Sequence, residues 1–469
     1  MTIRFFKHYF RVPFLLMGAS EALIFLVCAV ALMSSLTIVS GADVAAMGAS
    51  INWLPVTFFT VVMLLCLLSM GLYQARFRES ISSLLFRILV ACVLGAAMLT
   101  AVVEVVPWID IPKQKVFAAA VVSFLSISVV RIIFFWTVDS TLLKRRVVVY
   151  GAGKNANLIQ QRLRRKSDRR GFHIIGFMPT EHDAATSDKV TPELVLKPET
   201  DLCAFARDHN IDEIIEAVDN RERDLQMHQF MDCRAQGIRI TSLLNFFERE
   251  SGTVITSLID PSWIVFTEGF DQGLLRRSVK RLLDLMSATL LLLLTLPLMI
   301  GAAIAIIIES GWGQPVFYTQ TRVGRQGKLF KIIKFRSMRT DAEVAGAQWA
   351  TKNDNRVTKV GHYLRKYRID ELPQVFNVFR GDMSFVGPRP ERPEFDKDLK
   401  KTIPHYDQRY RVKPGITGWA QLCYPYGASH KDSVEKVQFD LYYVKNQSLF
   451  LDLLILFQTL EVVLFGKGR

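Results

Sequence analysis

Four long apolar stretches in the first 143 residues constrain the fold of this chain more than any other feature. Each stretch is close to the ~20 residues that a helix needs to cross the hydrocarbon core of a bilayer. Buried helices of a soluble protein are the alternative, but four successive runs without polar faces disfavour it. The sequence therefore predicts a bundle of four transmembrane helices over residues 1–143, with apolar runs at residues 13–39, 53–73, 88–106 and 116–138.

The basic residues around these runs predict the orientation of the bundle. Lys and Arg cluster before the first run, between the second and third, and after the fourth, whereas residues 40–52 contain neither. Because basic loops stay on the cytoplasmic side, both ends of the bundle and the domains that follow are predicted to be cytoplasmic. Glu21 and Glu104 lie within or at the edge of the runs. We expect them to hydrogen-bond between helices, and a functional role is the alternative.

The net charge of +14 narrows the classes of partner. A strongly basic chain suits nucleic acid, anionic lipid or a phosphorylated substrate. The apolar runs favour membrane lipids and a phosphorylated substrate. No RNA-binding or zinc-finger signature is present, so no nucleic-acid partner is expected. The six cysteines have no metal-ligand spacing, and we interpret them as small core hydrophobes of a protein in a reducing compartment.

A short apolar strand at residues 147–150 begins a second domain, predicted over residues 144–265. The strand leads into Gly151, Gly153 and Ala156 in a GxGxxA pattern and then a helical run, as in a dinucleotide-binding unit. Further strand-like segments follow at residues 172–177, 213–218 and 238–243. This alternation predicts a Rossmann-like α/β domain. The acid expected after the second strand is missing, which favours a structural or regulatory module over nucleotide binding at the GxGxxA residues.

An apolar run over residues 282–309 has basic residues on both flanks and Pro297 in its middle. If this run crossed the bilayer straight, one basic flank would lie outside, against the rule that oriented the first four runs. Proline removes a helical hydrogen bond and clashes with the preceding turn, so it favours a kink. The pattern predicts a re-entrant helix that is broken at Pro297 and enters and leaves on the cytoplasmic side. A straight span is the alternative.

Two adjacent carboxylates, Asp370 and Glu371, precede a short amphipathic segment in which Pro373 can begin a helix and Gly381 can end it. Arg365 and Arg389 flank this segment. Paired carboxylates are most often a solvated turn. Carboxylates among arginines, next to membrane-like segments, suit a divalent metal and a diphosphate. Mg²⁺ takes carboxylate and phosphate oxygens, while guanidinium groups bind phosphate through two hydrogen bonds. We therefore predict the active site here.

Basic and apolar residues alternate over residues 330–336. This pattern is typical of a surface strand. Because it includes Lys334 and Arg336, it also predicts a basic element at the membrane boundary that reaches phosphate. Residues 449–465 are apolar enough to form a helix that lies in the membrane interface.

Several motifs occur in a fixed order in the last 200 or so residues. They are Lys280-Arg-Leu-Leu-Asp284, Lys334-Phe-Arg-Ser-Met338, Asp370-Glu-Leu-Pro-Gln374, Gly381-Asp-Met-Ser-Phe-Val-Gly-Pro-Arg-Pro390 and Lys413-Pro-Gly-Ile-Thr-Gly-Trp419. Together they resemble the bacterial sugar transferase family of monotopic phosphoglycosyl transferases, over residues 274–465. The preceding spans and Rossmann-like domain resemble the large members that start exopolysaccharide or O-antigen assembly.

The resemblance implies an activity and a role for each matched residue. It implies transfer of a hexose-1-phosphate from a UDP-sugar to undecaprenyl phosphate, with release of UMP. Asp370 matches the nucleophile and a Mg²⁺ ligand, and Glu371 matches its partner in the acceptor step. Arg365 and Arg389 match phosphate-binding positions, and Lys334 and Arg336 lie in a motif close to the site.

The resemblance also implies an architecture and a location. It predicts a catalytic domain over residues 272–469 that contains the re-entrant helix, in a multi-pass protein of the bacterial inner membrane that forms a homodimer. The sugar is left open among glucose, galactose and an N-acetylhexosamine. The alternatives are a membrane-tethered NAD-dependent sugar-nucleotide enzyme and a non-catalytic scaffold for polysaccharide assembly.

Overall fold

The structure is a computed structural model of residues 1–469, and it describes most of them. The described residues are 2–5, 8–34, 53–73, 81–105, 112–138, 144–164, 166–169, 171–181, 183, 190–197, 201–260, 273–342, 354–424 and 429–464. Residues 40–52, which contain no Lys or Arg, lie outside them, and so do Arg76 and Arg78, the basic residues between the second and third apolar runs. By internal contacts the chain forms two compact units, one over residues 1–5 and 9–251, the other over residues 6–8 and 252–469. The predicted domain boundaries stay a prediction.

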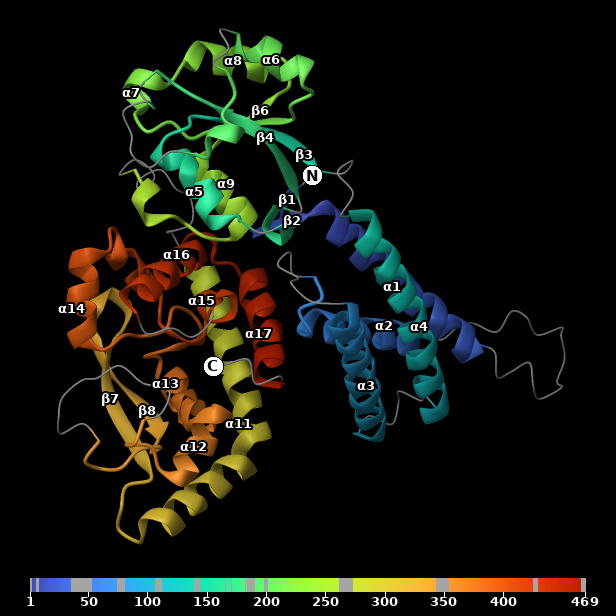
Figure 1. Ribbon diagram of the computed structural model, residues 1–469. Helices are drawn as coiled ribbons and strands as arrows, with labels where there is room; N and C mark the ends of the chain where they lie inside the picture. Colours follow the sequence, from blue (N-terminus) through green and yellow to red (C-terminus); the bar gives the residue numbers. More distant parts are fainter. Residues whose placement is uncertain are drawn as a thin grey trace, which may run out of the picture. The chain divides into compact units, whose positions relative to one another are not determined.

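The first unit begins with four apolar helices, coloured blue to teal in Figure 1. They are α1 (Val12–Ser34), α2 (Trp53–Ser69), α3 (Ile81–Val105) and α4 (Lys113–Val138), preceded by the short strands β1 (Thr2–Phe5) and β2 (His8–Arg11). Each helix packs on the next, and α4 also packs on α1. Among the described residues, α3, α4 and the later helix α11 are long and apolar enough to cross a membrane, whereas α1 and α2 count as shorter apolar helices. Four transmembrane spans therefore stay a prediction.

A buried ion pair joins the first and fourth helices. Arg131 donates to Glu21 through Nε, at 2.5 Å from Oε1, and through Nη2, at 2.9 Å from Oε2. Tyr73 also donates to Glu21, and Arg131 Nη1 lies 2.7 Å from the carbonyl of Leu72. This confirms that Glu21 hydrogen-bonds between helices. Glu104 forms an exposed ion pair with Lys113.

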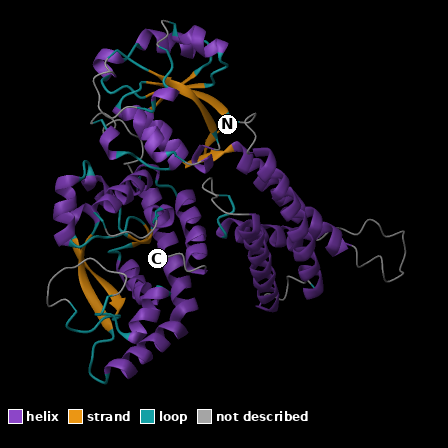
Figure 2. Ribbon diagram, viewed as in Figure 1, coloured by secondary structure: helices purple, strands orange, loops and turns teal. Residues whose placement is uncertain are grey.

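A parallel four-stranded sheet follows, with strand order β4-β3-β5-β6. The strands are β3 (Arg145–Tyr150), β4 (Phe172–Met178), β5 (Glu213–Glu216) and β6 (Arg239–Ser242). Helices α6 (Leu202–Asp208) and α8 (Met227–Ala235) cover one face, and α5 (Lys154–Arg162) and α9 (Leu243–Ser251) lie on the other; the short α7 spans Arg221–Asp224. Figure 2 shows the strands of this sheet between helices. The four predicted strands and the Rossmann-like arrangement are confirmed, because each strand is a short buried apolar run that the helical segments must cover.

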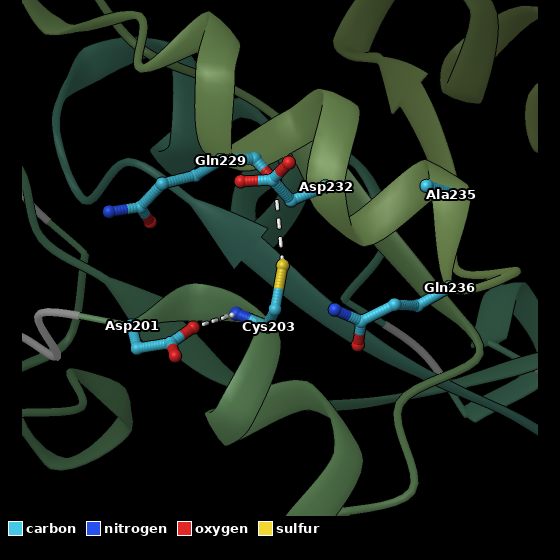
Figure 3. A pocket seen from close by; sticks show the side chains of 6 residues that line it. All are labelled: Asp201, Cys203, Gln229, Asp232, Ala235 and Gln236. Carbon is cyan, nitrogen blue, oxygen red and sulfur yellow. Dashed lines mark hydrogen bonds between the residues drawn. The ribbon is translucent and has the colours of Figure 1, made fainter.

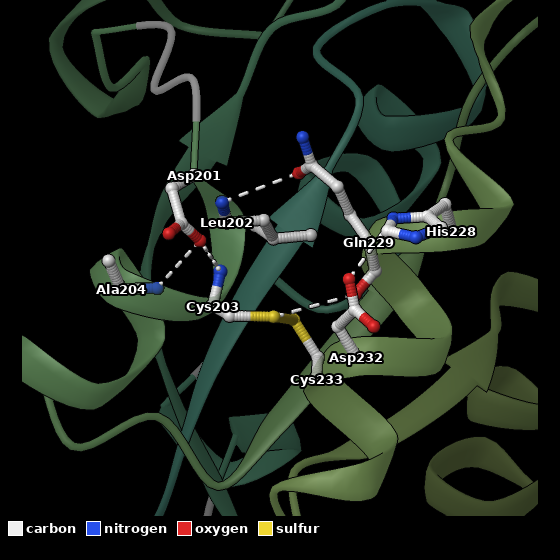
Figure 4. The surroundings of a disulfide bond; sticks show 8 residues. All are labelled: Asp201, Leu202, Cys203, Ala204, His228, Gln229, Asp232 and Cys233. Carbon is white, nitrogen blue, oxygen red and sulfur yellow. Dashed lines mark hydrogen bonds and ion pairs between the residues drawn. A yellow bond between two sulfur atoms is a disulfide. The ribbon is translucent and has the colours of Figure 1, made fainter.

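Cys203 of α6 and Cys233 of α8 form a disulfide, with their Cα atoms 5.1 Å apart (Figure 4). The sequence predicted unpaired cysteines, which is wrong for this pair, because 30 residues separate them and only the packing of α6 on α8 brings them together. A surface pocket opens beside them (Figure 3), and no predicted site residue lines it. Its lining residues are Asp201, Cys203, Gln229, Asp232, Ala235 and Gln236.

The second unit is built on α11 (Leu274–Ser310), a single helix of 37 residues that contains Pro297. At 1.5 Å per residue it is about 55 Å long, against ~30 Å of bilayer hydrocarbon. Figure 1 shows it changing direction along its length. Ala288 packs with Ile332 and Val375, and Met299 packs with Phe335. Both halves of α11 therefore pack on the same unit.

The other elements of this unit pack around α11. They are β7 (Phe317–Val323), β8 (Leu329–Phe335), α12 (Lys359–Lys366), the 3-10 helix η8 (Ile369–Gln374), α13 (Val375–Arg380), β9 (Ser384–Val386), α14 (Pro393–Thr402), the 3-10 helix η9 (Tyr406–Arg411), β10 (Gly415–Thr417), α15 (Trp419–Cys423), α16 (His430–Asn446) and α17 (Leu449–Leu464). Strands β7 and β8 form an antiparallel hairpin, and β9 pairs with β10 in parallel.

Candidate active site

The acid pair lies in η8, which runs directly into α13. Arg368, just before η8, has a left-handed backbone with φ 57°. The carbonyl of Arg368 accepts a hydrogen bond from the N–H of Glu371. The acids were predicted in a turn before a helix that starts at Pro373, but the helical turn starts earlier, at Ile369. The predicted end at Gly381 is confirmed, and the φ of 92° there explains the glycine.

Asn377 fixes α13 against the hairpin. Its Oδ1 accepts from the backbone N–H of Ile333 at 3.0 Å, and its Nδ2 donates to the carbonyl of Lys331 at 2.8 Å. Asn377 is fully buried, and the backbone of β8 provides a hydrogen-bond partner for each of its two polar groups. This contact sets the distance between η8 and the basic residues of β8. Asn377 was not predicted from the sequence, where its one local signal is an amide in an otherwise apolar helical segment.

Three cations surround the carboxylate of Glu371. Lys334 Nζ lies 2.8 Å from Oε1, and Arg389 Nη2 lies 2.6 Å from the same oxygen. Arg368 Nη1 lies 3.3 Å from Oε2. Burial by itself would raise the pKa of Glu371, but Arg389, Lys334 and Arg368 hold that pKa well below its usual range. Glu371 is therefore a fixed negative charge at neutral pH.

Asp370 differs from its neighbour in both contacts and charge. Its side chain is buried, and within the described part of the chain its carboxylate has no hydrogen bond or ion pair. Burial and the adjacent charge of Glu371 raise the pKa of Asp370 to about 6, although Lys334, Arg365 and Arg368 act against the rise. The structure thus places a free carboxylate, ionised at neutral pH, beside a fully paired one.

The other predicted site residues have different surroundings. Arg365 lowers the pKa of Asp370 by its charge, but no hydrogen bond between them is present. Burial lowers the pKa of Lys334, and Glu371 partly offsets this. Arg336 does not contact either acid: its Nη1 lies 3.4 Å from Gln314, and its Nη2 is buried without a partner. In a longer strand Lys334 and Arg336 would share a face, but β8 ends at Phe335 and the alternation does not extend to Arg336.

Backbone N–H groups of the glycine loop donate hydrogen bonds to two aspartates of the same chain. The N–H of Ala152 donates to Asp183 at 2.7 Å. At the start of α5, the N–H groups of Lys154 and Asn155 donate to the two oxygens of Asp219, each at 2.8 Å. In a dinucleotide-binding unit, donors of this kind hold the diphosphate.

The predicted nucleotide-binding residues do form this loop. Gly151 has φ 117°, Ala156 is buried, and a side chain at Gly153 would meet Asp219 and Asp183. Two carboxylates at this position repel a diphosphate, so the loop does not fit a bound dinucleotide or coenzyme A.

The fold and the acid site define a class: a membrane protein with a Rossmann-like domain and a separate unit that holds an acid pair among cations. A family model described as "Bacterial sugar transferase" matches residues 275–466, and one described as "CoA-binding domain" matches residues 68–233. The chain belongs to the bacterial sugar transferase family.

Three curated relatives illustrate the match. The UDP-glucose:undecaprenyl-phosphate glucose-1-phosphate transferase of Escherichia coli (strain K12) is 32% identical over 71% of this chain and 70% of that protein. Its namesake from Xanthomonas campestris pv. campestris is 33% identical over 63% of this chain and 62% of that protein. The UDP-N-acetylgalactosamine-undecaprenyl-phosphate N-acetylgalactosaminephosphotransferase of Aeromonas hydrophila is 47% identical over 40% of this chain and 44% of that protein. The chain thus spans between 44% and 70% of the length of these relatives.

Proposed function

We propose that the chain transfers a sugar-1-phosphate from a UDP-sugar to undecaprenyl phosphate and releases UMP. The observation that carries this proposal is the free, ionised carboxylate of Asp370 beside Glu371 and its three cations. An unpaired carboxylate is available as a nucleophile. The neighbouring cations can offset the charge of a diphosphate that approaches it. The names of the relatives supply the substrate classes.

The proposed reaction has two displacements at one phosphorus. In the first, an oxygen of Asp370 bonds to the phosphorus that carries the sugar. The bond from that phosphorus to the bridging oxygen breaks, and its electron pair leaves with UMP. In the second, a phosphate oxygen of undecaprenyl phosphate bonds to the same phosphorus and the carboxylate of Asp370 leaves. Arg389 and Lys334 bind phosphate oxygens in both steps, and Glu371 supports the acceptor step.

Asp370 fits the Mg²⁺ ion that the family implies. Its carboxylate has no protein partner, and no group of three metal-ligating side chains occurs among the residues that the structure describes. Mg²⁺ is commonly held by one or two carboxylates together with substrate phosphates and water. When bound, the ion supplies neutralisation of the diphosphate charge.

The contacts of α11 support a re-entrant helix. Before Pro297, Asp284 accepts hydrogen bonds from Ser384 Oγ at 2.8 Å and from the N–H of Phe385 at 3.0 Å. After it, Glu309 accepts from the N–H of Lys359 at 2.7 Å. A straight span would carry these two ends to opposite sides of a bilayer. We therefore propose that both ends are cytoplasmic and that the exposed apolar face between them enters the inner membrane.

The assembly and the pathway are proposed from the family alone. We propose a homodimer that acts at the first membrane step of exopolysaccharide or O-antigen synthesis. The sugar stays open, because the relatives' names include glucose, galactose and N-acetylgalactosamine. An NAD-dependent sugar-nucleotide enzyme is disfavoured by the carboxylates in the glycine loop.

The test is release of UMP by the purified protein. UDP-glucose, UDP-galactose and UDP-N-acetylhexosamines are each supplied with undecaprenyl phosphate and Mg²⁺. We expect one or more to release UMP, and Asp370→Asn to lower the rate by at least about 1,000-fold. Asp407→Asn, at an exposed acid of the same unit, is the matched control and keeps the wild-type rate. Intact-mass measurement without acceptor should find a sugar-phosphate adduct on the wild type alone.

A separate experiment tests the topology. Trp312 follows α11 and is 94% exposed, so Trp312→Cys can be labelled by a thiol reagent from the side it faces. The re-entrant arrangement predicts labelling only from the cytoplasmic side. Labelling of intact cells by an impermeant reagent from the periplasm would contradict it.

A further inference from the structure

Arg409 is a buried arginine on η9, outside the acid site. Its Nη2 donates to the backbone carbonyl of Arg389 at 2.8 Å and to Asp440 Oδ2 at 2.8 Å. Its Nη1 donates to the hydroxyl of Tyr406 at 2.8 Å, and its guanidinium lies over the Tyr406 ring. One planar group thus meets three acceptors at once, a geometry that suits arginine and not lysine.

A second arginine, which is partly buried, holds the next carbonyl along the same segment. Arg322 Nη1 donates to the carbonyl of Pro390 at 3.0 Å. Two prolines surround Arg389, so this part of the chain has few backbone donors of its own. The path of the backbone at Arg389 therefore depends on donors from η9 and β7.

The position of this backbone decides where the Arg389 side chain reaches. Arg389 Nη2 lies 2.6 Å from Glu371 Oε1, and Nη1 lies 3.4 Å from Oε2. A bidentate contact of this kind tolerates little displacement of the main chain. A shift of about 1 Å in a positioning element can cost on the order of 100-fold in rate.

We infer that Arg409 is a positioning residue, which holds the main chain of Arg389 so that its guanidinium meets Glu371 and the substrate phosphate. This inference rests on the proposed function for its effect on rate. Its effect on the backbone does not depend on that function. Arg409 contacts neither Asp370 nor Glu371, so it acts through Arg389.

The test is a double-mutant cycle with Arg409→Lys and Arg389→Ala, read as kcat and KM for UMP release. Arg409→Lys keeps the charge and loses the three-way contact. We expect it to lower kcat by about 10-fold while KM for the UDP-sugar changes less, and to change kcat by less than about twofold when residue 389 is already alanine. Arg411→Lys, at an exposed arginine of the same turn, is the control and stays within about twofold.

An equal loss in both backgrounds would show a general structural role and overturn the inference, and so would an unchanged kcat in Arg409→Lys. If Arg409→Lys does not fold, Asp440→Asn takes its place in the cycle. It keeps an acceptor oxygen but weakens the hold on Arg409, and a smaller loss of about threefold is expected with the same dependence on Arg389.

Hydrogen exchange separates this inference from the proposed function. The backbone amides of Gly415 and Val323 donate to the carbonyls of Pro388 and Glu391, on either side of Arg389. In Arg409→Lys these amides should exchange at least about fivefold faster than in Arg411→Lys, with any substrate or none. Unchanged exchange would overturn the positioning role. A wild type that releases no UMP from any UDP-sugar would refute the proposed function and leave the exchange result to decide on Arg409.

Discussion

The guanidinium of Arg389 meets the carboxylate of Glu371 through two contacts, Nη2–Oε1 at 2.6 Å and Nη1–Oε2 at 3.4 Å. Lys334 contacts the same Oε1 from β8 at 2.8 Å. These cations neutralise Glu371 and leave the adjacent Asp370 without a direct partner. The two neighbouring acids differ in their contacts because Arg389 reaches Glu371 and not Asp370.

The two-pronged contact predicts that charge alone at position 389 is insufficient. Arg389→Lys keeps the cation but can offer only one point of contact. We expect the rate of UMP release to fall by about 10-fold or more, with normal expression and folding. Steady-state kinetics beside Arg392→Lys, a nearby arginine that does not contact Glu371, provides the measurement and its control. Equal rates for wild type and Arg389→Lys would contradict a role for the two-point contact between Arg389 and Glu371.

The raised pKa of Asp370 predicts a pH dependence. A carboxylate attacks phosphorus only after it has lost its proton, and the pKa of Asp370 is raised to about 6 by burial and by Glu371. Glu371 stays ionised throughout, because its pKa is held well below the usual range. The rate should therefore fall as the pH is lowered through about 6 and level off above about 7. A profile of kcat from about pH 5 to about pH 8 that is flat, or rises toward acid, would refute this.

The same pKa predicts that Asp370 destabilises the fold at neutral pH. An acid whose pKa is raised in the folded state lowers the free energy of unfolding at any pH above that raised pKa. This loss of stability disappears as the pH falls to the pKa of the same acid in the unfolded chain. The rise from 3.8 to about 6 corresponds to about 3 kcal/mol.

Removing this charge should therefore stabilise the protein. Asp370→Asn should raise the melting temperature at about pH 8, and the gain should shrink to a small fraction of that by about pH 4. Thermal unfolding of both proteins without Mg²⁺ at the two pH values measures it. A gain that is the same at both would show a cause other than the charge.

The glycine loop predicts a negative binding result. Asp183 and Asp219 occupy the N–H groups that would hold a diphosphate, so NAD and coenzyme A should not bind there. Isothermal titration of the purified protein should find no saturable binding of either at millimolar concentration. Binding that is lost in Gly153→Val would contradict this, since a side chain at residue 153 blocks only this loop.

The buried pair in the helical bundle predicts a large loss of stability on removal of one partner. Glu21→Gln leaves the Arg131 cation buried without a counter-charge, which costs about 3–5 kcal/mol in comparable buried pairs. Glu104→Gln breaks an exposed pair with Lys113 and should change little. Thermal unfolding in detergent compares the two, and equal melting temperatures would show that the buried pair contributes nothing.

The local sequence pattern predicted the helices and strands well, but it predicted the contacts between them poorly. The strand predicted at residues 172–177 is β4 at Phe172–Met178, because a short apolar run bounded by turn residues has few other folds available. The partners of Asp219, Asn377 and Arg409 were not foreseen. Their hydrogen bonds to Lys154, Ile333 and Arg389 join residues 20 to 65 positions apart, and no spacing along the chain indicates such pairs.

The sequence by itself determined the apolar helices, the α/β unit, the acid pair and the family, because periodicity, composition and ordered motifs are local properties. Only the tertiary structure decided that the cations pair with Glu371 and not with Asp370, and that Arg336 contacts Gln314. It also decided that two aspartates accept the hydrogen bonds of the glycine loop. These outcomes depend on which backbone and side-chain groups meet after long-range packing. The strength of a hydrogen bond or of a charge–charge contact changes within an ångström or two of separation.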